Sequence, residues 1–276
     1  MSKTPNSRVN LDKAIQRFAG MVPETANRLR MNLANAIVAQ MIGDGVVKGG
    51  SGLLFRFGDM ATRRTMDLDT AWRFGLDSFL ADLKSKLAIG WHGFSGTIVV
   101  KKQAMPKGLP FDYVMQPCDV KMSYLGSPWF TVNLEIGHNE IGDADECENV
   151  EVPPAISELC GFLGFPAPSA LPAMRLEYQV AQKLHGCSAP GSKRPHDLID
   201  LQVIMANATV DLRKTSEICR RLFAYRKTHP WPPIIKKGEM WDEAYSAQKL
   251  ALPVLPTIDE AIEWANGLLA RIDAVE

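Results

Sequence analysis

Residues 48–72 read KGGSGLLFRFGDMATRRTMDLDTAW, and this stretch decides the fold. Two glycines and a serine precede an apolar run, and two aspartates one residue apart lie near its end. The pattern predicts a short strand over 46–50, a helix over 51–57 and a second strand around 65–69. The chain is therefore expected to place a glycine-serine turn at the start of a helix, between two strands.

The two aspartates alternate with apolar residues. A strand would bury Met66 and Leu68 and project Asp67 and Asp69 from the opposite face. Two carboxylates this close repel each other, so either one of them takes a proton or a cation lies between them. We expect Mg²⁺, or Mn²⁺, because such cations prefer carboxylate oxygens and commonly bridge to the phosphates of a substrate.

The glycine-serine turn offers a site for phosphate. Gly49 and Gly50 let an anion approach the backbone, and the first turn of the following helix presents N–H groups without partners. Ser51 can cap that helix and donate to a phosphate oxygen. The spacing fits neither the dinucleotide-binding motif GxGxxG nor the P-loop motif GxxxxGK[ST].

A third carboxylate is expected on a neighbouring strand. In TVNLEIG, the residues Val132, Leu134 and Ile136 face one way, and Glu135 faces the other. Asp119, in PCDVKM, is the competing candidate. The sequence leaves this choice open.

The rest of the chain divides into a mixed part and a helical part. A helix over 24–42 and another over 76–89 precede three strands, within 96–103, 111–125 and 128–137. The acidic stretch 140–151 predicts a solvated loop at a domain boundary. Further helices are expected over 154–164, 172–187, 195–207, 211–228, 241–250 and 257–274.

Composition narrows the class of protein. The 276 residues are 46% hydrophobic and carry 31 basic and 31 acidic side chains, so a polyanion could be attracted only by a local patch. The five cysteines form no CxxC pair and are expected to be free thiols, and the histidines form no zinc motif. No stretch has the length and apolar character of a membrane span, and we expect a cytoplasmic protein.

Taken in order, the motifs resemble those of a known family. A strand, a Gly-Gly-Ser turn and a second strand with DxD are similar to the polymerase-β-like nucleotidyltransferases. With RRTMDLD at 63–69, AQKL at 181–184 and RPHDLID at 194–200, they resemble the AbiEii family of nucleotidyltransferase toxins, which includes the MenT enzymes. The last family motif usually reads Arg-Asp-aromatic-x-Asp, whereas Pro and His follow Arg194 here.

The resemblance implies the fold and the reaction. It spans about residues 40–205 and implies an α/β (α+β) nucleotidyltransferase core with a mixed sheet. With the acidic boundary and the helical pattern beyond it, we expect that core over 1–150, which includes N-terminal helices, and a C-terminal α-helical domain over 151–276 that completes the nucleotide site. The resemblance also implies a metal-dependent enzyme, the toxin of a toxin–antitoxin pair, that transfers a nucleoside monophosphate from a nucleoside triphosphate. For several members the acceptor is the 3′ end of tRNA, whose modification blocks translation.

The resemblance also assigns roles to residues. It implies that Gly49, Gly50 and Ser51 hold the triphosphate. Asp67 and Asp69, with Glu135 as a third ligand, would hold the Mg²⁺ ions. Lys183 would neutralise the charge of the triphosphate, and Asp197 would shape the nucleotide pocket or orient Lys183.

A basic block follows the lysine motif. Residues 183–237 contain eleven Lys and Arg and four acids, a net charge of +7, whereas residues 238–276 have a net charge of −6. The block either pairs with the acidic tail or binds the phosphates of an acceptor RNA. The candidates for RNA contact are Arg213, Lys214, Arg220, Arg221, Arg226 and Lys227.

Thr65 is a candidate regulatory residue. It lies two residues before Asp67, so a phosphate on its hydroxyl would add negative charge beside the metal site and inactivate the enzyme. The alternative is that Thr65 is only a strand-favouring residue.

Two rival functions stay open at this point. A transferase that modifies a small molecule such as an antibiotic needs the same metals but no basic block. A binding module for nucleotide or RNA would keep the fold without catalysis.

Overall fold

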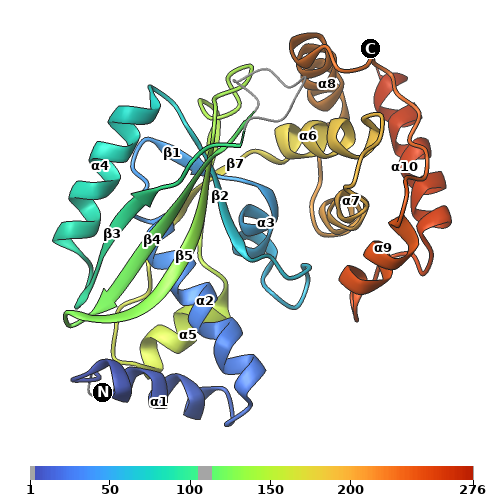
Figure 1. The fold of residues 1–276 in the computed structure, drawn as a ribbon. Coiled ribbons are helices and arrows are strands. Elements are labelled where there is room, and N and C mark those ends of the chain that lie inside the picture. The colour runs from blue at the N-terminus through green and yellow to red at the C-terminus, as the bar shows by residue number, and fades with distance from the viewer. Residues whose placement is uncertain (1–3, 105–113, 276) are drawn as a thin grey trace. The chain divides into compact units, whose positions relative to one another are not determined.

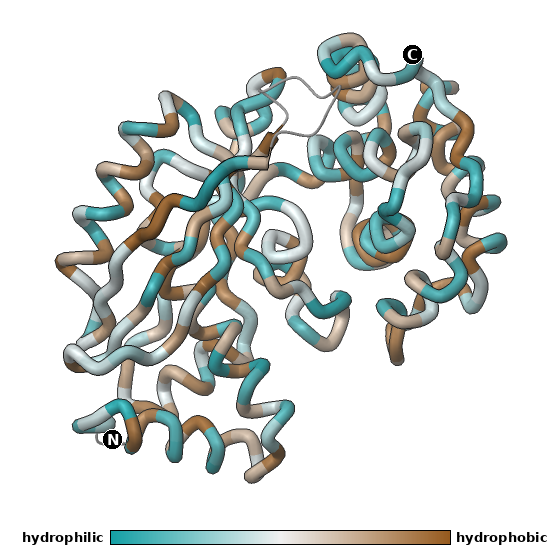
Figure 2. Tube along the Cα trace, in the orientation of Figure 1, coloured by the Kyte–Doolittle hydropathy of each residue, from teal (hydrophilic) through white to brown (hydrophobic). Residues whose placement is uncertain are grey.

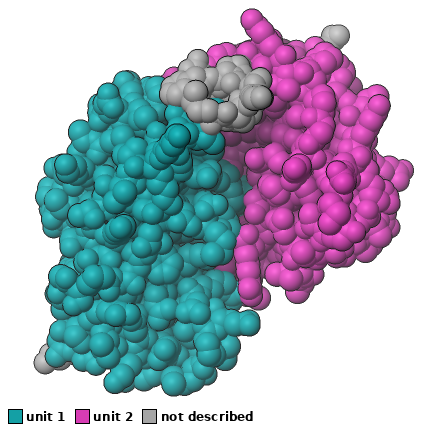
Figure 3. Space-filling model, in the orientation of Figure 1, with its two compact units in different colours: residues 1–58, 65–139, 147–173 teal, residues 59–64, 140–146, 174–276 magenta. Residues whose placement is uncertain are grey.

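A computed structural model of the protein describes residues 4–104 and 114–275. The first residues of the strand expected over 111–125 lie outside the described residues. The chain forms two compact units, coloured separately in Figure 3. Unit 1 comprises residues 1–58, 65–139 and 147–173, and unit 2 comprises residues 59–64, 140–146 and 174–276. The expected division into domains of residues 1–150 and 151–276 stays a prediction.

Unit 1 is built on a mixed sheet. Within the described residues it has seven strands in the order β3-β4-β5-β2-β1-β7-β6. The pairs β1–β2, β3–β4 and β4–β5 are antiparallel, whereas β2–β5 and β1–β7 are parallel. The strands are β1 (Gly45–Val47), β2 (Asp67–Trp72), β3 (Phe94–Val100), β4 (Gln116–Tyr124), β5 (Ser127–Gly137), β6 (Cys147–Val150) and β7 (Leu171–Met174).

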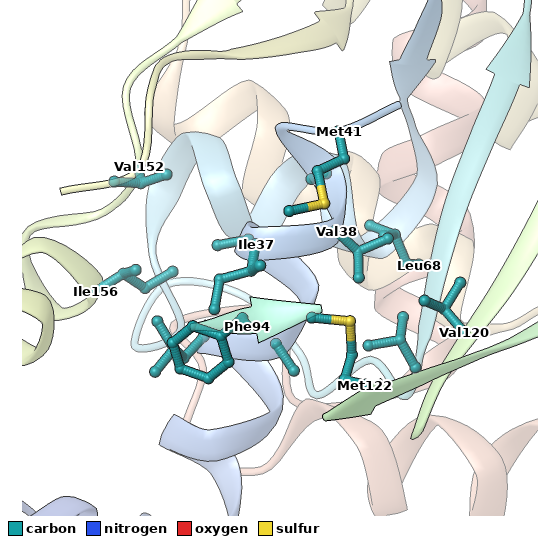
Figure 4. Packing of buried hydrophobic residues seen from close by; sticks show 14 of the residues in the cluster. Ile37, Val38, Met41, Leu68, Phe94, Val120, Met122, Val152 and Ile156 are labelled. Atoms are coloured by element: carbon teal, nitrogen blue, oxygen red, sulfur yellow. The ribbon is translucent and has the colours of Figure 1, made fainter. Parts of the chain in front are cut away.

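Helices cover the sheet of unit 1 and enclose its core. In Figure 1, α4 runs beside β3, and α1, α2 and α5 gather near one end of the strands. Ile37 and Val38 of α2, and Met41 just after this helix, are buried together with Leu68 of β2 and Met122 of β4 (Figure 4). The helices are α1 (Arg8–Phe18), α2 (Pro23–Ala39), α3 (Gly49–Phe57), α4 (Leu76–Ile89) and α5 (Pro154–Phe162).

Unit 2 is helical, and two of its helices begin with side-chain caps. The Asp211 side chain accepts the N–H of Lys214 at the start of α8, and Thr257 and Glu260 form a capping box at the start of α10. Hydrophilic and hydrophobic residues alternate along these helices in Figure 2. The helices are α6 (Leu176–Ser188), α7 (His196–Asn207), α8 (Leu212–Arg226), α9 (Trp241–Lys249) and α10 (Ile258–Asp273).

The mixed α/β class with a helical part is confirmed, with local corrections. The stretch 172–187 is not one helix, because β7 precedes α6. The acidic stretch is not a plain solvated loop either: it contains β6, and Glu140 and Asp143 are buried. Met66 is exposed rather than buried, because β2 begins only at Asp67.

The structure also bears on membrane-spanning helices and on the state of the cysteines. In the part of the chain that the structure describes, no helix has the length and apolar character needed to cross a membrane. The five cysteines are free thiols, as expected.

Candidate functional site

The glycine-serine turn of unit 1 touches the aspartate strand directly. Ser51 lies in the first turn of α3 with only 1% of its surface exposed, and its hydroxyl donates to the backbone carbonyl of Asp67. The N–H of Lys48, the residue before α3, donates to the carbonyl of Asp69 at 2.9 Å. The fifteen residues between Ser51 and Asp67 comprise the rest of α3 and a loop, and they bring Asp67 back to the start of that helix.

Gly49 is required by the position of Asp69. Its φ is +61°, in the left-handed region that a side chain disfavours. A Cβ built on Gly49 would lie 2.1 Å from Asp69 Oδ2, far inside contact distance. The Asp69 carboxylate therefore occupies the space that the missing side chain leaves.

The three carboxylates expected to bind metal lie on neighbouring strands of unit 1. Asp69 of β2 is the direct partner of Glu135 of β5, and Asp67 is the partner of Asn133. Paired residues of parallel strands point to the same face, and residues two apart on a strand share that face. Asp67, Asp69 and Glu135 therefore share one face of the sheet, opposite to the buried Leu68.

The competing carboxylate has a partner of its own. Asp119 lies on β4 opposite Asn133 and forms an ion pair with Lys101. Among residues 4–104 and 114–275, no three or more His, Cys, Asp or Glu are grouped closely enough to hold a metal. A metal role for Asp67, Asp69 and Glu135 stays a prediction.

Unit 2 contains a buried network of charged side chains around Lys183. Lys183 Nζ lies 2.5 Å from Asp200 Oδ2 and 3.4 Å from Asp197 Oδ1. Arg63 binds Asp200 with two hydrogen bonds, Nε–Oδ1 of 2.9 Å and Nη2–Oδ2 of 3.0 Å. Arg194 binds Asp197 in the same manner, at 2.6 and 3.2 Å. The network therefore brings the cations of Arg63, Lys183 and Arg194 together with the carboxylates of Asp197 and Asp200.

The pKa shifts show that these carboxylates stay ionised. Burial alone would raise the pKa of Asp197, but Arg194 and Lys183 lower it well below its usual range. Burial would likewise raise the pKa of Asp200, but the positive charges of Lys183 and Arg63 outweigh this effect and lower it. Burial lowers the pKa of the neighbouring His196 to about 4, so that imidazole is neutral near pH 7.

The network includes residues to which the sequence analysis gave no role. Asp200, rather than Asp197, lies nearest to Lys183. The signal for Asp200 was its spacing of three residues from Asp197 on one helix face, and the signal for Arg63 was its place at the start of RRTMDLD. Nothing local in the sequence indicates that Arg63 pairs with Asp200, 137 residues away.

The basic residues expected to contact RNA differ in their partners within unit 2. Lys214 pairs with Glu146, Arg220 with Asp273 of the acidic tail, and Arg226 with the buried Glu140. Arg221 Nη2 donates to the carbonyl of Ile141 at 2.5 Å. Arg213, Arg220, Arg221 and Lys227 remain exposed to solvent. Pairing with the acidic tail is thus observed at one of the six candidates.

Thr65 lies beside the glycine-serine turn. It precedes β2, and its hydroxyl is 3.4 Å from the carbonyl oxygen of Asp67, which also accepts from Ser51. Only 7% of the surface of Thr65 is exposed. A phosphate on this hydroxyl would have to break its contact with Asp67.

Comparisons with known proteins concern the family and the fold. Residues 35–266 match the family model described as nucleotidyl transferase AbiEii toxin, type IV TA system. The fold is similar to MenT4, a nucleotidyltransferase toxin from Mycobacterium tuberculosis H37Rv (TM-score 0.59, 16% identity, 96% of this chain and 90% of that chain). It also matches JHP933 from Helicobacter pylori (TM-score 0.48, 17% identity, 91% and 93% of the two chains). No curated protein matches the chain.

Proposed function

The chain belongs to the AbiEii family of nucleotidyltransferase toxins of type IV toxin–antitoxin systems, and from this premise we propose that it transfers a nucleoside monophosphate from a nucleoside triphosphate to the 3′ end of tRNA. The reaction would depend on Mg²⁺ or Mn²⁺, block translation, and be countered by a cognate antitoxin. The observation that carries the proposal is the direct contact of Ser51 with Asp67 and of Gly49 with Asp69.

The residues of unit 1 suit a metal ion and a triphosphate. Asp67, Asp69 and Glu135 offer hard oxygen ligands on one face, and Gly49 leaves room for Asp69 by lacking a side chain. A bound divalent metal would supply charge neutralisation for the attacking and leaving oxygens. Gly49, Gly50 and Ser51 would bind the phosphates through backbone N–H groups at the start of α3.

The residues of unit 2 would supply positive charge. Asp197 and Asp200 of α7 both pair with Lys183, which restrains the position of its ammonium. A fixed ammonium stabilises developing negative charge without reorganisation during the reaction. We propose that Lys183 neutralises the charge of the triphosphate, the role that the family resemblance implies for it.

The acceptor would be held by charge on α8. Arg213, Arg220, Arg221 and Lys227 are exposed along or just after this helix, where they could contact phosphates of a folded RNA. Contacts of this kind position the acceptor and depend on salt, and they read little of the base sequence.

The test is transfer of label. The protein is incubated with Mg²⁺, total RNA and each of the four α-labelled nucleoside triphosphates in turn. We expect label in tRNA, and none with Asp69→Ala, whereas Asp77→Asn should behave as the unmodified protein because Asp77 is exposed on α4. Label in small molecules instead of RNA would favour the antibiotic-modifying alternative. Nucleotide binding without any transfer would favour the binding module.

A further inference from the structure

Lys48 is a cation on the carboxylate face of the unit 1 sheet. It follows β1 and precedes α3, and its backbone N–H bonds to the carbonyl of Asp69. This bond continues the antiparallel register of β1 with β2, in which Val47 faces Thr70, so Lys48 stands opposite Asp69. Directly opposite residues share a face, which places the Lys48 side chain on the face of Asp67, Asp69 and Glu135.

The Lys48 ammonium lies over Gly137 at the end of β5. A Cβ built on Gly137 would be 2.6 Å from Lys48 Nζ and 3.2 Å from Lys48 Cε. The side chain of Lys48 therefore crosses β2, the strand between β1 and β5, to reach this position. The partner of Gly137 on β2 is Ala71, which is also small. Two small residues thus leave a path for the lysine.

We propose that Lys48 is a phosphate-binding residue of the candidate site, and that Gly137 is glycine in order to hold its ammonium there. Asp67, Asp69 and Glu135 share the face with Lys48, and so does Asp119, which is paired with Lys101. A polyphosphate held by metal ions at those carboxylates brings further negative charge, which a lysine neutralises without strict geometry. This role rests on the proposed function, because the polyphosphate would be the triphosphate of the nucleotide or the pyrophosphate that leaves.

The geometry makes Gly137 a probe of the ammonium position. Gly137→Ala keeps the charge of Lys48 but displaces Nζ, because the new Cβ would occupy its place. The other close atom is the Thr70 carbonyl oxygen at 3.3 Å, and this contact is the same whichever residue stands at position 48. The effect of Gly137→Ala on phosphate affinity should therefore vanish when Lys48 is already lost.

The test measures binding of inorganic tripolyphosphate in the presence of Mg²⁺ by titration calorimetry. Lys48→Met should weaken binding by about 10- to 100-fold, as loss of a charged hydrogen bond does. Gly137→Ala should weaken it less, and the double variant should match Lys48→Met alone. Lys84→Met, at an exposed lysine of α4, is the matched control and should leave the affinity unchanged. Thermal unfolding checks that each variant folds.

Two outcomes would overturn this role. Unchanged tripolyphosphate affinity in Lys48→Met would mean that the ammonium does not bind phosphate, and tighter Mn²⁺ binding in that variant would mean that it serves only the carboxylates. Additive effects of the two substitutions would mean that Gly137 does not act through Lys48. Failure of the proposed function looks different, because the unmodified protein would then bind tripolyphosphate through Lys48 and yet transfer no nucleotide to RNA.

Discussion

The contact between Gly49 and Asp69 gives a prediction whose size follows from the structure. Gly49→Ala places a methyl group 2.1 Å from Asp69 Oδ2, whereas ordinary contact begins at 3.4 Å, so the carboxylate must retreat by roughly 1.3 Å. A displacement of about 1 Å at a reacting centre can cost on the order of 100-fold in rate. We therefore expect nucleotide transfer to fall by about 100-fold.

The same substitution also carries a backbone cost. A side chain at φ of +61° destabilises the fold by about 1 to 2 kcal/mol. Gly20 offers a matched control, because its φ is +62° and a Cβ there would meet nothing within 4 Å. Gly20→Ala carries the backbone cost without moving Asp69. It should lose similar stability in urea unfolding and keep its transfer activity.

The assay compares the two variants at saturating label. Single-turnover transfer to tRNA is measured for Gly49→Ala and Gly20→Ala at a temperature where both are folded. Rates for the two variants within about threefold of each other would refute the reasoning, because the position of Asp69 would then not limit the reaction. Loss of activity in both would show that general stability, and not the carboxylate, was being measured.

Four further predictions concern other parts of the chain. Arg63→Met removes one of the two cations that pair with the buried Asp200, so the free energy of unfolding in urea should fall by about 3 kcal/mol. A decrease of less than about 0.5 kcal/mol would contradict a buried ion pair. Thr65→Glu should abolish transfer while Thr65→Val keeps it, and full activity of the glutamate variant would end the idea of a phosphorylation switch. Replacing Arg213 and Arg221 by Gln should weaken tRNA binding and flatten its salt dependence by about two charges, whereas an unchanged slope in filter binding would place the RNA elsewhere. Burial lowers the pKa of His185 from 6.5 to about 3, so below pH 6.5 the unfolded chain binds a proton at this residue that the folded chain does not bind. The free energy of unfolding should therefore fall as the pH falls, by about 2 kcal/mol near pH 5. His185→Gln should remove that part of the pH dependence in urea unfolding.

The sequence predicted the elements that depend on local patterns. The helix over 76–89 is observed over the same residues, because an apolar stripe and glycines on both sides define it locally. The stripe of Leu29, Leu33 and Ile37 in α2 is buried as expected. The short strands β6 and β7 escaped prediction, because three or four residues carry too little periodicity to distinguish a strand from a loop or a helix end.

The sequence predicted which motifs form the candidate site, but it did not predict which of their residues contact one another. The order of the motifs indicated the family, which the family match confirms. The metal, nucleotide and RNA roles of single residues stay predictions. The position of Asp69 over Gly49 and the pairing of Arg63 with Asp200 could not be read from the sequence.

By itself, the sequence determined the helix over 76–89 and the alternation that places Asp67 and Asp69 on the face opposite Leu68. Each depends on backbone geometry that repeats within a few residues. Only the tertiary structure decided that Lys48 reaches Gly137 and that two arginines and a lysine share Asp197 and Asp200. Such contacts join residues far apart in the chain, and they exist because burial of the apolar faces fixes the path of the backbone between them.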